Sequence, residues 1–419
     1  MIAPTHAPHA GDIFSINLLG QPVIVLNSVK AAKDLLDKRS AIYSDRFKST
    51  VVPLIGWDWN VALMGYGPQW RQTRRAFHEH FHPGAVKQYE PSQLSGARKY
   101  IMRLLTNPEN FVQDLRYDLG ATILEVSYGI KAQGRNDRYI AIGERAVEGP
   151  NEALVLGALW VEFLPFLRHL PPWFPGASYQ RRAARWRADA MALKHVPFTT
   201  AIEDFRDGKG TWSLASEILH REYQVGGGSS TGTEELAQNV AAVTYGAGAD
   251  TSFSTLQTFF LAMALHPDVQ RKAQAELDAV IGPMRLPDFE DQKSLPYIQA
   301  IVKEAISHDS QTYPEPDVFN PDRFFSECRW DHNLPDPGDY AFGFGRRACP
   351  GRHFALASIY VYVASVLHVF NIVPKQDARG NPVEIKPDMI SGVVTYPTKF
   401  ECDIRPRSQE AEALIRLCA

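Results

Sequence analysis

The chain has 419 residues, of which 45% are hydrophobic and 11% aromatic, so it is long and apolar enough to bury a large core. This composition excludes a disordered chain, a collagen-like fibre and a small disulfide scaffold. The formal net charge is −3, so no overall attraction to nucleic acid is expected. The four cysteines form no CxxC pair, which argues against a disulfide framework and a four-thiolate zinc site.

The N-terminal part of the chain predicts a short hairpin. Segment 11–27 reads as two strands around a turn at Gly20, and Ser28 can cap the helix that follows. Residues 1–14 contain no basic stretch followed by an apolar one. We therefore expect neither a signal peptide nor an N-terminal membrane anchor.

Two later segments are strongly apolar. Segment 154–174 contains Trp160 and Trp173, and it fits equally a core helix with a proline turn or a surface that touches a lipid bilayer. Segment 354–373 reaches the length of a membrane span without Asp, Glu, Lys or Arg. It contains polar side chains, however, and we predict a core helix in which they are hydrogen-bonded.

A long helix is predicted over 234–265, after a glycine- and serine-rich loop at 226–233. Gly246 and Gly248 lie in its middle. Each costs a helix about 1 kcal/mol relative to alanine, which indicates that another group approaches the helix closely there.

The loop 342–351, FGFGRRACPG, places Cys349 directly before the apolar helix. Unpaired helix amides and two arginines favour a thiolate at this place, while Gly345 and Gly351 allow the backbone to approach a flat ligand. The alternative is an inert buried cysteine after a turn.

The same loop resembles a known family. Its Phe342, Gly345, Arg347, Cys349 and Gly351 fit the pattern FxxGxRxCxG, the haem-binding loop of the cytochromes P450. The resemblance implies haem b as cofactor, with Cys349 as the axial thiolate ligand of its iron.

The segment 247–252, AGADTS, resembles the oxygen-binding motif of that family. Ala247 and Gly248 are small enough for the helix to lie against a porphyrin, and the Thr251 hydroxyl can bond the Ala247 carbonyl and open a groove for O2. The resemblance implies that Asp250 helps to relay protons. The alternative is a packing groove beside a solvated aspartate.

Three further motifs extend the resemblance. Trp70 and Arg74 fit the WxxxR pattern whose side chains donate to a haem propionate. Segments 295–304 and 321–324 resemble the K helix and the PERF motif, with Glu304 and Arg323 in two of the three places of the family's structural network.

The third place departs from the family pattern, because Ser307 stands where the K helix has an arginine. By the resemblance, the family has a few dozen more residues between Glu304 and the stretch before the PERF motif. They hold that arginine, strands of the main sheet, a substrate-facing loop and another propionate ligand, and this chain does not contain them. We therefore expect an incomplete sheet. We also expect Glu304 and Arg323 to lose their shared partner, and an unpaired buried charge costs about 3–5 kcal/mol.

The resemblance, closest to fungal microsomal P450s, implies one mainly α domain with a small β portion over 1–419. It implies a monooxygenase of secondary metabolism that inserts one atom of O2 into a small lipophilic substrate with electrons from NADPH–cytochrome P450 reductase. Arg346, Arg347 and Arg352 are candidates for steering that acidic partner. The family's place is the cytosolic face of the endoplasmic reticulum membrane, although the chain without an anchor could also be soluble.

Two alternatives stay open. The first is a remnant that binds haem poorly or not at all, because the network arginine and adjacent strands are missing. The second is a zinc hydrolase, because segment 78–82 fits HExxH. Pro83 disfavours a helical His82, and Arg74 would repel a nearby Zn²⁺.

Overall fold

The computed structural model describes residues 11–155, 160–171, 173–175, 177–226, 231–306, 315, 318–326, 329–331, 333–390 and 392–418. Part of the predicted loop at 226–233, part of segment 154–174, Ser307 and Cys328 lie outside these residues.

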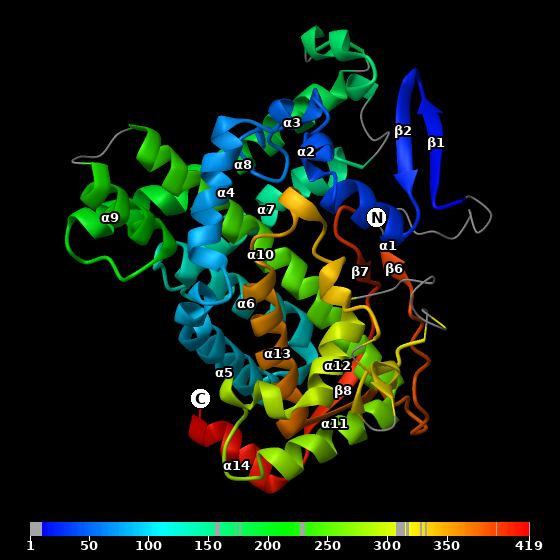
Figure 1. The fold of residues 1–419 in the computed structure, drawn as a ribbon. Coiled ribbons are helices and arrows are strands. Elements are labelled where there is room, and N and C mark those ends of the chain that lie inside the picture. The colour runs from blue at the N-terminus through cyan, green and yellow to red at the C-terminus, as the bar shows by residue number, and fades with distance from the viewer. Residues whose placement is uncertain are drawn as a thin grey trace.

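Helices dominate the structure (Figure 1). The long ones are α4 (Pro68–Phe81), α5 (Glu90–Thr106), α6 (Phe111–Tyr128), α7 (Arg138–Ala153), α8 (Ser178–Arg206), α9 (Leu214–Gly226), α10 (Thr231–Leu265), α11 (Pro267–Val280) and α13 (Arg352–Val369). The shorter ones are α1 (Val29–Ala32), α2 (Ser40–Tyr43), α3 (Val51–Leu54), α12 (Pro296–Ala305) and α14 (Gln409–Cys418).

The β portion is small, as predicted. The described residues form four two-stranded antiparallel sheets: β1 (Ile13–Leu18) with β2 (Gln21–Leu26), β3 (Phe325–Ser326) with β4 (Arg329–Trp330), β5 (Phe370–Pro374) with β8 (Cys402–Pro406), and β6 (Met389–Ile390) with β7 (Tyr396–Pro397). The predicted hairpin is confirmed, with six cross-strand pairs from Ile13↔Leu26 to Leu18↔Gln21.

Helix α10 crosses the molecule and packs against α6, α8, α9 and α13 (Figure 1). Its N-terminal half, through Tyr245, belongs to one buried apolar cluster, and its C-terminal half, from Phe253, belongs to another. Segment 246–252 lies between the two clusters. The prediction of one long helix at 234–265 is confirmed, and the interruption of the core falls at its glycines.

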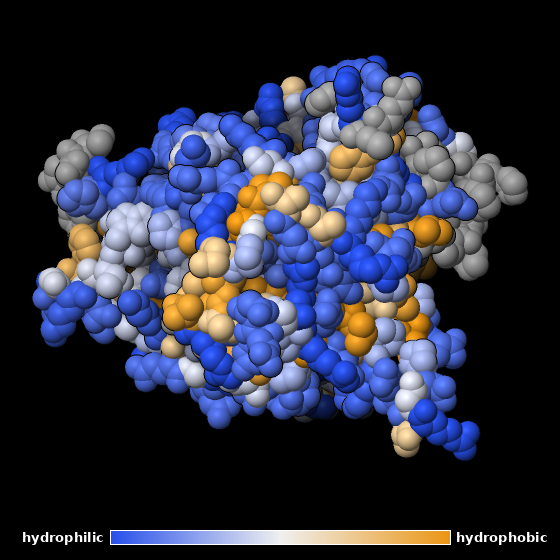
Figure 2. Space-filling model, turned by 90° about the horizontal axis from the view of Figure 1, so that it is seen from below, coloured by the Kyte–Doolittle hydropathy of each residue, from blue (hydrophilic) through white to orange (hydrophobic). Residues whose placement is uncertain are grey.

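Helix α13 is the one described helix with the length and hydropathy of a membrane span, and 72% of it is buried. Some of its polar side chains have partners inside the protein, as predicted for a core helix, whereas the buried hydroxyls of Tyr362 and Ser365 have no hydrogen-bond partner among the described residues. Ser358 accepts a hydrogen bond from Gln93 at 2.6 Å, and the Tyr360 hydroxyl donates to the Asp288 carbonyl at 3.0 Å. Figure 2 shows the molecule from below, where hydrophilic residues cover most of the surface and several separate hydrophobic patches lie between them.

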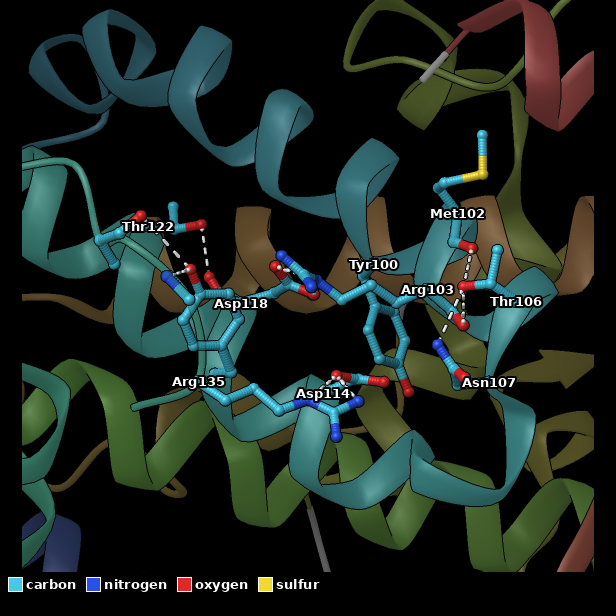
Figure 3. Close-up of polar contacts among 12 residues, drawn as sticks. Tyr100, Met102, Arg103, Thr106, Asn107, Asp114, Asp118, Thr122 and Arg135 are labelled. Atoms are coloured by element: carbon cyan, nitrogen blue, oxygen red, sulfur yellow. Dashed lines mark hydrogen bonds and ion pairs between the residues drawn. The ribbon is translucent and has the colours of Figure 1, made fainter. Parts of the chain in front are cut away.

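Buried carboxylates tie α6 to its neighbours (Figure 3). Asp118 forms an ion pair with Arg103 of α5 at 3.1 Å, and Asp114 one with Arg135 at 2.5 Å. The two carboxylates are almost fully buried, whereas each arginine is about one-third or more exposed. Burial raises the pKa of Asp118 to about 7, because the nearby Arg103 offsets only part of the lost hydration.

Candidate functional site

A cavity of about 320 Å³ lies where α10, α4 and the loop before α13 meet. Nine of the predicted site residues line it, namely Trp70, Arg74, Ala247, Gly248, Thr251, Phe342, Arg347, Cys349 and Gly351. These residues come from three stretches of sequence that are far apart. Gly345 and Asp250 are not among the residues that line it.

The α10 wall of the cavity has the predicted local geometry. The Thr251 hydroxyl donates to the Ala247 carbonyl at 2.9 Å, and both residues face the cavity. The neighbouring glycines serve packing. A Cβ on Gly248 would lie 2.9 Å from Cγ1 of Ile123 in α6, and one on Gly246 would lie 3.2 Å from Leu193 in α8. The close approach predicted there is therefore made at least in part by other helices.

Asp250 points away from the cavity. Its carboxylate lies 3.3 Å from the Arg116 guanidinium and accepts a hydrogen bond from the Tyr396 hydroxyl. It is buried rather than solvated, which corrects the alternative of a solvated aspartate. Sequence reasoning missed Arg116 and Tyr396, because they come from α6 and β7, far from α10 in the chain.

The loop before α13 holds Cys349 in place through its own backbone. The Cys349 amide donates to the Phe342 carbonyl at 2.7 Å, and Gly345 has a φ of +53°. A Cβ on Gly345 would lie only 2.0 Å from the Leu36 carbonyl oxygen, and the Gly345 amide donates to the Asp37 carboxylate. The structure therefore gives Gly345 a packing reason, because the segment after α1 occupies the place of a side chain. Gly351, the other glycine of the prediction, lines the cavity, whereas Gly345 does not.

The electrostatics of Cys349 are mixed. Burial raises the pKa of its thiol, while the Gly351 amide and the Arg74 and Arg352 guanidinium groups lower it. The predicted effect of the helix amides is present, but the arginines that lower this pKa are Arg74 and Arg352 and not the two arginines of the loop, Arg346 and Arg347. The loss of hydration outweighs these contributions. The side chain is nevertheless open to the cavity. A positively charged metal at the sulfur would reverse the balance.

Three guanidinium groups line the cavity, and their donors are only partly used by the protein. Arg347 donates from Nε to the Ser44 carbonyl at 2.7 Å and from Nη1 to the Val61 carbonyl at 3.1 Å. Its Nη2 is buried without a hydrogen-bond partner among the described residues. Burial lowers the pKa of Arg347 to about 10, and the group still carries its charge at neutral pH.

Arg74 and Arg46 complete this cationic set. Arg74 donates to the Ala348 carbonyl at 2.5 Å, and Arg46 donates from Nε to the Ala62 carbonyl at 2.8 Å. The Arg347 guanidinium lies 4.5 Å from the centre of the Trp70 ring. Sequence reasoning missed Arg46, because no local motif surrounds it. Guanidinium groups with free donors match carboxylates in charge and shape, so this set fits the propionates of a haem.

Glu304 and Arg323 pair directly with each other. Their side chains lie 3.0 Å apart and are only 4% and 6% exposed. Arg323 also donates to the Val318 carbonyl at 2.8 Å, and the Asn320 amide donates to Glu304 at 3.0 Å. The expectation of an unpaired buried charge is therefore wrong, because segment 318–323 brings both the arginine and backbone partners to the glutamate.

The HExxH segment does not have the geometry of a zinc site. His82 ends α4 in an extended conformation, with φ −67° and ψ 162°, and its Nδ1 accepts hydrogen bonds from the Gly84 and Ala85 amides. Within the described ranges, no three His, Cys, Asp or Glu residues are grouped so that they could hold a metal ion.

The arginines near Cys349 divide between surface and interior. Arg346 and Arg352 are exposed, whereas Arg347 is directed into the cavity. Of the three arginines predicted to steer a reductase, only Arg346 and Arg352 are therefore on the surface.

Segment 160–171 forms short 3-10 turns rather than the core helix that was one of the two alternatives. Trp160, Phe166 and Trp173 are exposed by 64%, 65% and 79%. Glu162 accepts hydrogen bonds from Ser49 and from the Val51 amide, which fixes the segment over α3.

The fold and the cavity define a class: a mainly helical protein whose cavity has an open cysteine and a set of guanidinium groups suited to a flat anionic cofactor. The family model "Cytochrome P450" matches residues 6–306 and 304–403. The chain therefore belongs to the cytochrome P450 family, whose cofactor is haem iron, and it is a P450 monooxygenase.

Curated fungal relatives support this assignment. The chain is 37% identical to cytochrome P450 monooxygenase COX2 of Coprinopsis cinerea, over 97% of this chain and 84% of the relative. It is 38% identical to a cytochrome P450 monooxygenase of Armillaria gallica, over 96% and 86%. Tryptamine 4-monooxygenase of Psilocybe cyanescens is 33% identical, over 95% and 86%.

The comparisons also locate a break. The two matches to the family model meet at residues 304–306, where the sequence indicates a missing stretch. The alignment with the Coprinopsis relative spans 445 positions but contains 97% of 419 residues, or about 406, so about 39 positions face no residue of this chain.

Proposed function

We propose that this chain binds haem b with Cys349 as the iron ligand and inserts one atom of O2 into a small lipophilic substrate. The observation that carries the proposal is the buried Nη2 of Arg347, which lacks a partner among the described residues in a cavity that also contains Cys349. A buried donor without an acceptor is costly, and a propionate oxygen would satisfy it. Bound haem would supply the activation of O2.

The side chains around the cavity have separate tasks in this proposal. Arg347, Arg74 and Trp70 hold the propionates, and Arg46 adds positive charge beside them. Phe77, Phe81 and Phe354 exclude water and favour a lipophilic substrate. The substrate class is inferred from this lining.

Proton delivery would use both faces of α10. The Thr251 hydroxyl holds a proton at the cavity, anchored on the Ala247 carbonyl. Asp250 lies behind the helix with Arg116 and Tyr396, so it must change rotamer before it can pass a proton toward Thr251.

Electrons would come from NADPH through cytochrome P450 reductase, at the exposed Arg346 and Arg352 beside the cysteine loop. Arg352→Glu is expected to slow reduction and to weaken its salt dependence. Stopped-flow reduction at two ionic strengths measures this. Unchanged kinetics would place the reductase elsewhere.

The cellular setting proposed is secondary metabolism at the cytosolic face of the endoplasmic reticulum. Support comes from the exposed Trp160, Phe166 and Trp173, which suit the interfacial region of a bilayer. Flotation with phosphatidylcholine vesicles tests it, and Trp173→Ser should reduce the bound fraction. A chain that never floats would favour the soluble form.

A second candidate is a haem-free remnant, and the break at residues 304–306 is the observation that favours it. The two are separated by reducing the purified chain, adding CO and recording the Soret band. A thiolate-type band that is lost in Cys349→Ala and retained in Cys418→Ala supports the enzyme. Apo-protein after expression with excess haem supports the remnant.

A further inference from the structure

The hairpin β1–β2 stands apart from the helical body (Figure 1). Its turn consists of Leu19 and Gly20, with φ of +51° and +89°, as in the two-residue turns that close tight hairpins. Among the described residues, β1 pairs with β2 and with no other strand. A two-stranded hairpin by itself is marginally stable in water, and a third strand changes that.

The register shows which backbone groups of β1 are not used in pairing with β2. In an antiparallel ladder, residue pairs that exchange hydrogen bonds alternate with pairs that do not. A two-residue turn makes Leu18↔Gln21 a hydrogen-bonded pair, so every second pair from there is bonded as well. The bond from the Asn27 amide to the Asp12 carbonyl, at 2.8 Å, agrees with this alternation. The backbone N–H and C=O groups of Ile13, Ser15 and Asn17 therefore point away from β2.

The two edges of the hairpin are not equivalent. The outward positions of β2 begin at Pro22, which has no N–H to donate. The outward positions of β1 all retain their donors. Natural edge strands are protected by lysine, proline or bulges, but segment 13–26 contains no charged residue and β1 contains no proline. Ile13, Ile16 and Ile24 are exposed by 51%, 42% and 65%.

We propose that two copies of this chain pair antiparallel through β1, about a two-fold axis at Ser15, to form a four-stranded sheet. The occupant is a second copy because the uncharged strand meets itself without like-charge repulsion, and its outward donors and acceptors match in this register. Phe14, Ile16 and Leu18, which share one face of β1, form a continuous apolar face with the same residues of the second copy. Since each copy has one intact edge, the assembly closes at two copies.

Sedimentation velocity of the full chain between 1 and 100 µM tests the proposal. We expect a monomer–dimer equilibrium in the wild type. Ser15→Pro removes the two central hydrogen bonds between the copies without touching the bonds to β2, and the dissociation constant should rise about tenfold or more. Ser15→Thr keeps the donor and is the matched control.

Charge variants separate edge pairing from misfolding. Ser15→Lys and Ser15→Asp each place like charges opposite one another at the axis, so each protein alone should be monomeric. An equimolar mixture of the two should recover a dimer. A wild type that stays monomeric at 100 µM, or a dimer equally strong in Ser15→Pro, would overturn the proposal. The test needs no haem and is independent of the proposed function.

Discussion

Two arginines of this chain lie in buried surroundings and use their donors differently. Arg323 directs Nε to Glu304 and Nη2 to backbone carbonyls. Arg347 also donates to two carbonyls, but its Nη2 is buried in the cavity wall without a partner in the described part of the chain. A guanidinium that bonds a carboxylate of its own chain serves the fold, whereas one with a buried spare donor is arranged for a ligand.

The largest expected effect comes from breaking the structural pair. Glu304→Gln leaves the Arg323 guanidinium buried without its counter-charge, which should lower the free energy of unfolding by about 3–5 kcal/mol. Urea denaturation of the apo-protein measures it. The double variant Glu304→Leu/Arg323→Leu should lose less free energy of unfolding than the sum of the losses in Glu304→Leu and in Arg323→Leu. Additive losses would mean that the two side chains do not interact.

Breaking the Asp118–Arg103 pair should have an effect between those at the Glu304–Arg323 pair and at Arg347. Asp118 is buried, but its partner Arg103 is partly exposed. The folded pKa of about 7 is above the unfolded value of about 3.9, so the folded state binds more protons between these values. Stability should therefore fall as pH rises from 4 to 7. Asp118→Asn should remove this loss, on the order of 2–4 kcal/mol.

Thermal unfolding of the wild type and of Asp118→Asn, each at pH 5 and at pH 8, measures how much stability each protein loses as the pH rises. The control is Glu401→Gln, at an exposed side chain. The raised pKa of Asp118 would be contradicted if the change in stability between pH 5 and pH 8 were the same in the wild type and in Asp118→Asn.

The smallest effect is expected in the cavity, and it concerns ligand binding more than folding. Arg347→Gln should weaken haem retention by roughly 1.5–3 kcal/mol, the worth of a hydrogen bond to a charged group, or about tenfold and more in affinity. The rate at which each protein loses haem to added apomyoglobin measures this difference in haem retention. The stability of the apo-protein should change less than in Glu304→Gln. Equal haem affinity in both proteins would remove Arg347 from the binding set.

Much of the site could be predicted because its geometry is local. Thr251 reaches the Ala247 carbonyl because residues four apart in a helix are neighbours, and the loop 342–351 folds on its own backbone. The core position of α13 also follows from its own sequence, in which polar side chains interrupt an apolar stretch.

Tertiary structure decided the rest, because the partners come from distant segments. The Leu36 carbonyl lies where a side chain at position 345 would be, which is why a glycine is found there. Arg116 and Tyr396 bind the Asp250 carboxylate, and Arg46 lines the cavity although no sequence motif predicts it. The direct pairing of Glu304 with Arg323 depends on how segment 318–323 packs after the break. Local spacing therefore indicated most of the predicted residues that line the cavity, whereas long-range packing added Arg46, turned Asp250 away and determined which polar groups are left for a ligand.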